Sequence, residues 1–174
     1  MLQAAQAGEN VLLIAPTGGG KTLSGFLPSL VELAATRENP ALHTLYISPL
    51  KALATDIARN LTAPVEDLKL PIRIETRTGD TPTDRRKRQR ENPPDMLLTT
   101  PESLALLLSL EDAPKMFAGL RRVVIDEIHA LAGTKRGDQL ALCLARLTTL
   151  APAAQRVGLS ATVAHKKPLL DFVA

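Results

Sequence analysis

One segment of the sequence combines residue types and spacing that suit phosphate binding. Residues 15–22 read Ala-Pro-Thr-Gly-Gly-Gly-Lys-Thr, and they follow an apolar run and open a helical pattern. Consecutive glycines let backbone N–H groups approach a phosphate closely, because no Cβ atom stands in the way. A helix that starts at the loop adds the positive end of its dipole. The alternative is a glycine-rich turn with a Lys-Thr pair by chance, but the strand before and the helix after favour a phosphate-binding loop.

The last two residues of this loop predict a nucleotide together with its metal ion. Lys21 would place a positive charge on the β- and γ-phosphates, and Thr22 would offer its hydroxyl to Mg²⁺. The predicted cofactors are therefore ATP and Mg²⁺. The predicted nucleotide-binding residues are Pro16, Thr17, Gly18, Gly19, Gly20, Lys21 and Thr22.

A pair of carboxylates follows another apolar run. Residues 123–129 read Val-Val-Ile-Asp-Glu-Ile-His, which puts Asp126 and Glu127 at the tip of a predicted strand. Burying both would be costly unless a cation or strong donors met them, and Mg²⁺ is the obvious cation. We assign Asp126 to the metal, through water, and Glu127 to orienting and activating the attacking water. The alternative is a structural helix start, where acidic residues are favourable. The predicted catalytic residues are Lys21, Asp126 and Glu127, and the predicted metal-site residues are Thr22 and Asp126.

Short apolar runs alternate with helical patterns along the chain. The runs are residues 11–15, 42–48, 72–77, 96–99, 123–126 and 156–160. The helical stretches are residues 22–35, 52–60, 82–90, 102–110 and 138–150. Most runs are continuously apolar, as in strands buried on both faces. The alternation predicts one α/β domain over residues 1–174, with a mostly parallel sheet and helices on both faces. Such sheets bind ligands at the carboxyl ends of their strands, where both motifs lie.

Composition excludes several other classes of protein. The chain has 174 residues, of which 45% are hydrophobic, enough for one domain with a core. Its single cysteine, Cys143, excludes an internal disulfide and a cysteine-based zinc site. No apolar run approaches the roughly 20 residues needed to cross a bilayer, and residues 11–15 are too short for a signal peptide. We therefore expect a cytoplasmic protein with no membrane partner.

Positive charge is concentrated in one short segment, the basic strip of residues 85–90. It reads Arg-Arg-Lys-Arg-Gln-Arg, and without its five charges the formal net charge would fall from +3 to −2. The strip could attract phosphates, or it could be the solvated face of a helix. The chain has three Phe, one Tyr and no Trp, so stacking of bases on aromatic side chains is not its main binding mode.

Five short motifs resemble, in order, those of superfamily 2 helicases. Residues 126–129, Asp-Glu-Ile-His, look like the DExH form of the Walker B motif, and residues 160–162, Ser-Ala-Thr, look like motif III. Residues 48–53, Ser-Pro-Leu-Lys-Ala-Leu, resemble motif Ia. Residues 78–80, Thr-Gly-Asp, resemble motif Ib, and residues 100–102 match the Thr-Pro-Glu motif. The family also accepts alanine as the first residue of its phosphate loop. The resemblance implies a RecA-like P-loop NTPase domain.

The resemblance also implies a role for each motif. Motifs Ia, Ib and Thr-Pro-Glu would grip the sugar-phosphate backbone of a single strand, and motif III would couple that grip to ATP. His129 could be only a hydrogen-bonded core residue, but its place two residues after Glu127 favours coupling. The predicted coupling residues are His129, Ser160 and Thr162. The predicted nucleic-acid-binding residues are Pro49, Lys51, Thr78, Gly79, Asp80, Thr100, Pro101 and Glu102.

A narrower resemblance is to the large helicase-related (Lhr) family, through residues 13–30 and 129–137, and to its bacterial ligase-associated branch through residues 138–146. It implies an ATP-driven 3′-to-5′ translocase that acts on single-stranded DNA in DNA repair. Helicases of this superfamily hold ATP between two RecA-like domains, so we expect the chain to be the first half of a longer protein whose second domain supplies arginine fingers. The alternatives are an RNA helicase and a nucleotide- and strand-binding module without turnover. The helicase motifs argue against a P-loop kinase.

Overall fold

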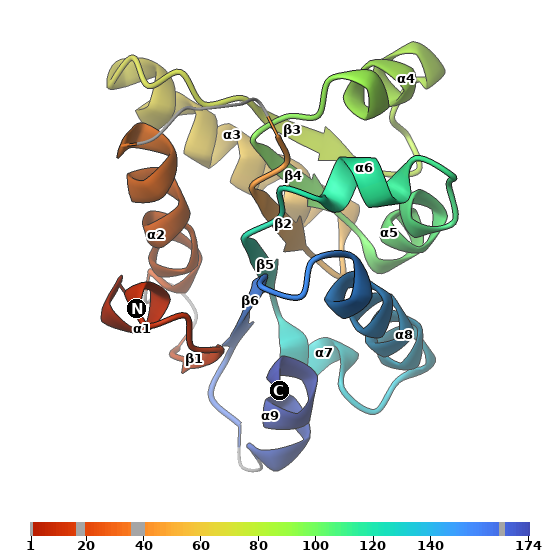
Figure 1. Ribbon diagram of the computed structural model, residues 1–174. Helices are drawn as coiled ribbons and strands as arrows, with labels where there is room; N and C mark the ends of the chain where they lie inside the picture. The colour runs from red at the N-terminus through yellow and green to blue at the C-terminus, as the bar shows by residue number, and fades with distance from the viewer. Residues whose placement is uncertain (1, 17–19, 36–40, 164–165) are drawn as a thin grey trace.

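The computed structural model describes residues 2–16, 20–35, 41–163 and 166–174, which form a single parallel sheet with helices around it (Figure 1). The strands of this sheet are β1 (Val11–Ile14), β2 (Thr44–Ile47), β3 (Ile74–Arg77), β4 (Met96–Thr99), β5 (Arg122–Ile125) and β6 (Gln155–Ser160). Their spatial order is β1-β6-β5-β2-β4-β3, and every pair is parallel. The predicted α/β class and parallel sheet are confirmed.

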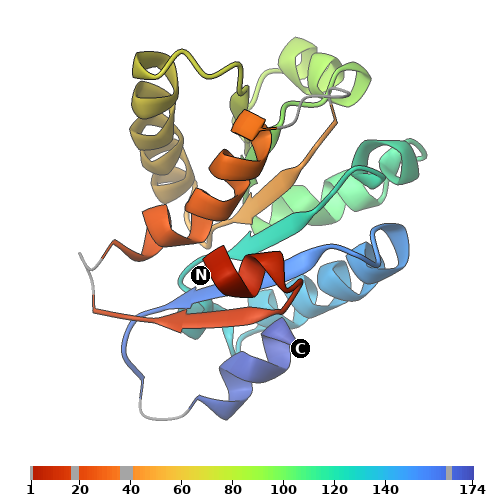
Figure 2. The same cartoon turned by 60° about the vertical axis from the view of Figure 1, so that its left-hand side comes forward.

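Nine helices belong to the described residues: α1 (Leu2–Gln6), α2 (Lys21–Ala35), α3 (Lys51–Asp67), α4 (Thr83–Glu91), α5 (Pro101–Leu108), α6 (Ala113–Phe117), α7 (Ile128–Leu131), α8 (Lys135–Leu150) and α9 (Lys167–Val173). Helices α2 and α3 lie on one face of the sheet, and α5, α6 and α8 lie on the other (Figures 1 and 2). The chain first moves from β1 outward to β3 and then returns through β4 and β5 to β6. Right-handed crossovers in opposite directions place their helices on opposite faces. The predicted helices on both faces are therefore confirmed.

The core has two parts, one on each face of the sheet. Side chains of α2 and α3, among them Phe26 and Ile57, pack on one face. Side chains of α5 to α9, among them Leu104 and Leu140, pack on the other. The central strands β2, β4 and β5 are buried along their whole length, which is why they appear in the sequence as continuous apolar runs.

Some predicted boundaries were wrong for reasons of packing. The helix predicted over residues 52–60 continues to Asp67 and contains Pro64. Its buried positions Ala54, Ile57, Leu61 and Val65 keep a helical spacing beyond residue 60, and their burial outweighs the cost of the internal proline. The short helices α6, α7 and α9 were not predicted, because four to seven residues carry too little periodicity to be recognised. No helix of the described ranges is long and apolar enough to cross a membrane.

Candidate nucleotide site and nucleic-acid interface

The carboxyl ends of three neighbouring strands bring the phosphate loop, the acidic motif and motif III together. Ile14 at the end of β1 is in register with Ser160 at the end of β6, and the backbone N–H of Ala15 donates to the Ser160 carbonyl at 3.2 Å. Strand β5, which precedes Asp126, pairs with the other side of β6. Motif III thus lies between the other two motifs. Three predicted nucleotide-binding residues, Thr17, Gly18 and Gly19, lie outside the described residues.

Lys21 is a buried cation at the first position of α2. Lys21 is only 6% exposed, and its Nζ atom has no hydrogen-bond partner among the described residues. Gly20, just before it, has φ +71°, a left-handed conformation that glycine adopts without strain. A buried ammonium without a partner is costly, and phosphate oxygens would satisfy it. Thr22, the next residue of the helix, is half-buried. Lys21 and Thr22 therefore fit a nucleotide with its metal ion. Pro16 is exposed at the entry to the loop.

The carboxylate of Asp126 is held on both of its oxygens. Asp126 is 2% exposed, and its backbone N–H donates to the carbonyl of Ile47 at 2.9 Å. Its Oδ1 accepts the N–H of Glu127 at 2.8 Å, and its Oδ2 accepts the hydroxyl of Tyr46. Burial and then the charge of Asp126 raise the pKa of Tyr46 well above its usual range, so the phenol stays protonated and donates. Tyr46 was missing from the predicted site; its only sequence signal is one hydroxyl in an apolar run.

Glu127 adopts a backbone conformation that is unusual for a residue with a side chain. Its φ and ψ are 47° and 41°, in the left-handed region, where it precedes α7. Such a conformation costs about 1–3 kcal/mol and persists only where surrounding contacts enforce it. It places the Oε2 atom 3.3 Å from Nε2 of His129. The strained turn therefore sets the position of the side chain that we assign to the attacking water.

The imidazole of His129 joins the acidic motif to motif III. Its Nδ1 accepts the backbone N–H of Ala161 at 3.3 Å and lies 3.2 Å from Oγ of Ser160. Because a backbone amide can only donate, Nδ1 carries no proton, and in the neutral ring the proton is on Nε2, facing Glu127. Contacts to both motifs favour the predicted coupling role over that of a core histidine. Thr162, the other predicted coupling residue of motif III, is exposed beyond the end of β6.

Motifs Ia and Ib line a groove of about 580 Å³ near the end of β3. Lys51 begins α3, and its Nζ lies 3.0 and 3.1 Å from the two carboxylate oxygens of Asp80. Gly79 is exposed beside this pair, whereas Thr78 is buried. The groove presents hydroxyls and cations, which are the groups that bind phosphate and sugar oxygens, together with the carboxylates of Asp56 and Asp80. Its lining residues include Lys51, Thr55, Thr76, Thr78, Asp80, Thr81 and Arg85.

The Thr-Pro-Glu motif forms the start of α5. The Thr100 side chain caps the helix by accepting the N–H of Ser103 at 3.4 Å, and Pro101 follows it as the first helical residue. Thr100 is 4% exposed, and its hydroxyl also donates to Oγ of Ser103 at 3.3 Å. Its contact with a nucleic-acid strand stays a prediction. Sequence reasoning recognised the motif but not that capping would occupy its threonine.

Arg136 connects two of the predicted strand-binding motifs. It lies on α8, and its Nε donates to Glu102 at 2.6 Å while an Nη donates to the carbonyl of Pro49 at 2.7 Å. Burial alone would raise the pKa of Glu102, but hydrogen bonds, first that from Arg136, outweigh it and lower this pKa. Pro49 is buried and Glu102 is exposed. Arg136 was absent from the predicted site residues, because nothing in its spacing relates it to either motif.

The basic strip forms ion pairs and hydrogen bonds with neighbouring elements, although Lys87, Arg88 and Arg90 are exposed. Arg85 and Arg88 pair with Glu75 of β3, each at 3.3 Å, and Arg90 pairs with Asp112 at 2.7 Å. Arg86 donates to the carbonyl of Gly79 at 2.6 Å. These contacts fasten α4 to the sheet edge and to motif Ib. Arg85 alone of the strip also lines the groove.

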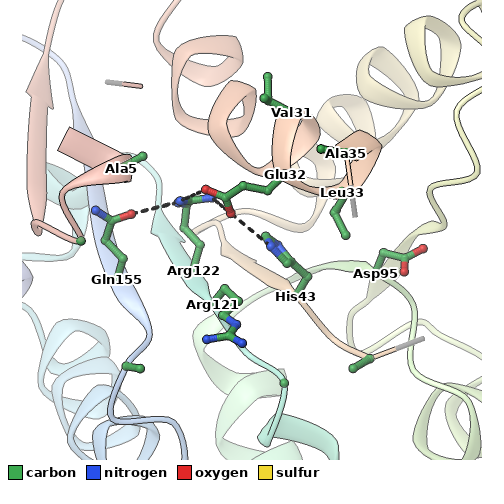
Figure 3. Close-up of a pocket in the computed structure, with 14 residues that line it drawn as sticks. Ala5, Val31, Glu32, Leu33, Ala35, His43, Asp95, Arg121, Arg122 and Gln155 are labelled. Atoms are coloured by element: carbon green, nitrogen blue, oxygen red, sulfur yellow. Dashed lines mark hydrogen bonds and ion pairs between the residues drawn. The ribbon is translucent and has the colours of Figure 1, made fainter. Parts of the chain in front are cut away.

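A further cavity of about 620 Å³ opens at the opposite edge of the sheet, by the starts of β2, β5 and β6 (Figure 3). The guanidinium of Arg122, buried in its floor, donates to Glu32 at 2.8 Å and to Gln155 at 3.1 Å (Figure 3). His43 lies 3.2 Å from the same Glu32. This network ties α2 to β5, to β6 and to the residue that precedes β2. None of the predicted site residues that the structure describes lines this cavity.

A phosphate-loop helix, an acidic pair at a strand end and a third motif between them, all on one edge of a parallel sheet, define a RecA-like P-loop nucleotide-binding domain. The chain belongs to the DEAD/DEAH box helicase family, whose family model matches residues 1–169. The predicted superfamily 2 helicase membership is confirmed.

Relatives of the chain include the Lhr helicases of bacteria and archaea. The Escherichia coli Lhr helicase/uracil glycosylase is 46% identical over 95% of this chain and 12% of its own length. The structure of the Mycobacterium smegmatis helicase Lhr bound to single-stranded DNA and AMP-PNP matches with a TM-score of 0.87 and 46% identity, over 98% of this chain and 23% of that one. The helicase MrfA bound to DNA and AMPPNP matches with a TM-score of 0.86 and 29% identity, over 99% and 24%. The chain therefore corresponds to a small part of these relatives.

Proposed function

We propose that this chain is the first motor domain of an ATP-dependent DNA helicase or translocase that serves DNA repair in the cytoplasm, and that it belongs to the ligase-associated bacterial branch of the Lhr family. The observation that carries the proposal is the buried ammonium of Lys21, which has no hydrogen-bond partner among the described residues and lies on the same sheet edge as Asp126 and Glu127. Because the chain spans 12% of the E. coli relative, catalysis is proposed for the longer protein that contains it, here called the parent protein.

Each residue at this edge would have a separate role in ATP hydrolysis. Lys21 and the loop around it would hold the phosphates, and the Thr22 hydroxyl with Asp126, through water, would hold Mg²⁺. When bound, Mg²⁺ neutralises charge that develops on the phosphates. Glu127 would orient the attacking water and accept its proton, and the contact with His129 fixes where its carboxylate lies. An arginine from a second RecA-like domain would complete the site.

The groove of motifs Ia and Ib is proposed to follow the backbone of a single strand. Its hydroxyls and cations suit phosphates and sugars, and the described residues that line it include no aromatic side chain on which a base could stack. DNA is proposed over RNA because both the Lhr and the MrfA structures hold DNA. The 3′-to-5′ direction is proposed on the family resemblance. Contact from Glu127 through His129 to Ser160 would couple this grip to the nucleotide.

Hydrolysis by the parent protein tests the proposal. Single-stranded DNA should stimulate ATP hydrolysis strongly, and RNA of the same sequence should compete poorly for binding. Glu127→Gln should bind ATP and DNA but hydrolyse slowly, whereas Lys21→Ala should lose nucleotide binding. Equal nucleotide affinity in wild type and Lys21→Ala, measured by calorimetry, would refute the nucleotide site. Equal stimulation by RNA and DNA would instead favour the RNA helicase.

A further inference from the structure

Tyr46 makes contacts with two separate parts of the nucleotide site. It lies on β2 with no exposed surface, and its ring stacks on Phe26 of α2 with centroids 5.0 Å apart and an interplanar angle of 28°. Helix α2 is the helix that begins with Lys21. The hydroxyl of Tyr46 donates to Oδ2 of Asp126. One rigid side chain therefore spans from the helix of the phosphate loop to the acidic strand end.

We propose that Tyr46 is a positioning residue, whose hydroxyl fixes the orientation of the Asp126 carboxylate toward Mg²⁺ and the nucleotide phosphates. This inference rests on the proposed nucleotide site. A carboxylate oxygen has two acceptor positions. The hydroxyl of Tyr46 on Oδ2 and the N–H of Glu127 on Oδ1 hold both oxygens, and each keeps a free position for metal-bound water.

A purely structural role would not need the hydroxyl. A phenylalanine would fill the same space and stack on Phe26 equally well, without a polar group that costs free energy when buried. The hydroxyl is satisfied by Asp126, and the stack holds the ring that carries it. Partners that orient a metal-site carboxylate typically contribute about 10- to 100-fold to metal affinity or activity. We therefore expect the hydroxyl to act on metal binding.

The first test removes the hydroxyl and keeps the ring. In Tyr46→Phe, the apparent Mg²⁺ affinity of the ADP complex, measured by calorimetry over a Mg²⁺ series, should fall about tenfold. ADP binding without Mg²⁺ should stay the same, and so should the thermal unfolding midpoint within a few degrees. An unchanged Mg²⁺ dependence would overturn the inference.

A double-mutant cycle separates the hydroxyl from general packing. On an Asp126→Asn background, Tyr46→Phe should have no further effect on Mg²⁺ dependence, because the carboxylate that the hydroxyl orients is already gone. Equal effects on both backgrounds would overturn the assignment. Lys21→Ala is the reference for the site itself. If Lys21→Ala binds ADP as well as wild type, the proposed function fails; if only the Tyr46→Phe result fails, the inference alone is lost.

The wild-type chain offers a measurement without any change at Tyr46. Tyr46 is the only tyrosine and there is no tryptophan, so intrinsic emission reports on this one residue. A hydrogen-bonded carboxylate quenches phenol emission. Adding Mg²⁺ to the ADP complex should therefore change the emission as Asp126 takes up the metal, and Asp126→Asn should remove this response. Constant emission on Mg²⁺ addition would overturn the inference even if the substituted chains failed to fold.

Discussion

The imidazole of His129 lies 3.3 Å from the carboxylate of Glu127 on one side and 3.2 Å from the hydroxyl of Ser160 on the other. Glu127 is the residue assigned to the attacking water, and Ser160 begins the motif expected to sense the strand. Since Nδ1 accepts from the backbone of Ala161, a shift of motif III would move the ring and with it the position of Glu127. This contact gives a physical route between strand binding and hydrolysis.

His129→Ala should break this route and leave the nucleotide site intact. In the parent protein, we expect stimulation of ATP hydrolysis by DNA to fall about tenfold, the range for a lost orienting partner. Nucleotide affinity should stay near wild type, because no described contact of His129 reaches Lys21. Ser160→Ala is the matched change on the other side of the ring and should act in the same direction. Full stimulation in His129→Ala would contradict the coupling role.

Sequence reasoning found the strand ends but not how their side chains are oriented. The strand-loop-helix pattern located Lys21, and the two carboxylates located Asp126, because local order alone places both at the carboxyl edge. Tyr46 and Arg136 were missed because their partners lie 80 and 87 residues away along the chain, and only the strand order brings them together. For Thr100 the motif was recognised, but its hydroxyl is used in a cap.

The partners of the basic strip could not be predicted from the sequence either. Its charges were visible in the sequence, but the pairing of two of them with Glu75 depends on how α4 folds back against β3, the strand just before it. No local pattern in the sequence gives the orientation of that helix.

The ion pair between Lys51 and Asp80 should weaken the binding of single-stranded DNA. Both side chains are largely exposed, at 55% and 77%. Exposed pairs are worth at most about 1 kcal/mol, so Asp80→Asn should raise affinity for single-stranded DNA by up to about fivefold at low salt. Lys51→Ala should lower it and reduce the salt slope by about 0.7. Asp84→Asn, an exposed acid on α4 outside the groove lining, is the control for net charge. Equal gains in Asp80→Asn and Asp84→Asn would show a general charge effect.

Arg85 and Arg88 allow a matched test of the basic strip. Both pair with Glu75, but only Arg85 also lines the groove. Arg85→Gln should reduce the salt slope of DNA binding in the parent protein by about 0.7, as for one lost phosphate contact. Arg88→Gln should leave the slope near wild type. Binding to a labelled strand at several salt concentrations measures both. Identical slopes in the two variants would restrict the strip to fastening α4.

The free energy of unfolding should fall on the acid side partly because of His43. Burial is the largest cause and lowers the pKa of His43 from its usual 6.5; Glu32 opposes this, and Arg122 and Arg121 add to the lowering. The unfolded chain therefore binds a proton at a pH where folded His43 does not. The contribution of neutral His43 to the free energy of unfolding is fully present above about pH 6.5. This contribution is lost as the pH falls through and below that value. The pKa of His43 is lowered although Glu32 lies 3.2 Å away, because burial and then two nearby guanidinium groups oppose its protonation.

Replacing His43 removes the group that titrates and keeps most of the contacts. His43→Gln should be less stable than wild type at about pH 7.5, because a packed ring is lost. The difference in free energy of unfolding between the two proteins should narrow at about pH 5.5. At that pH wild type loses the stability that depends on neutral His43, whereas glutamine does not titrate. Urea unfolding of both proteins at the two pH values measures this. A difference that stays constant or widens toward acid would show that the Glu32 contact dominates and that folded His43 takes up its proton more readily than the unfolded chain does.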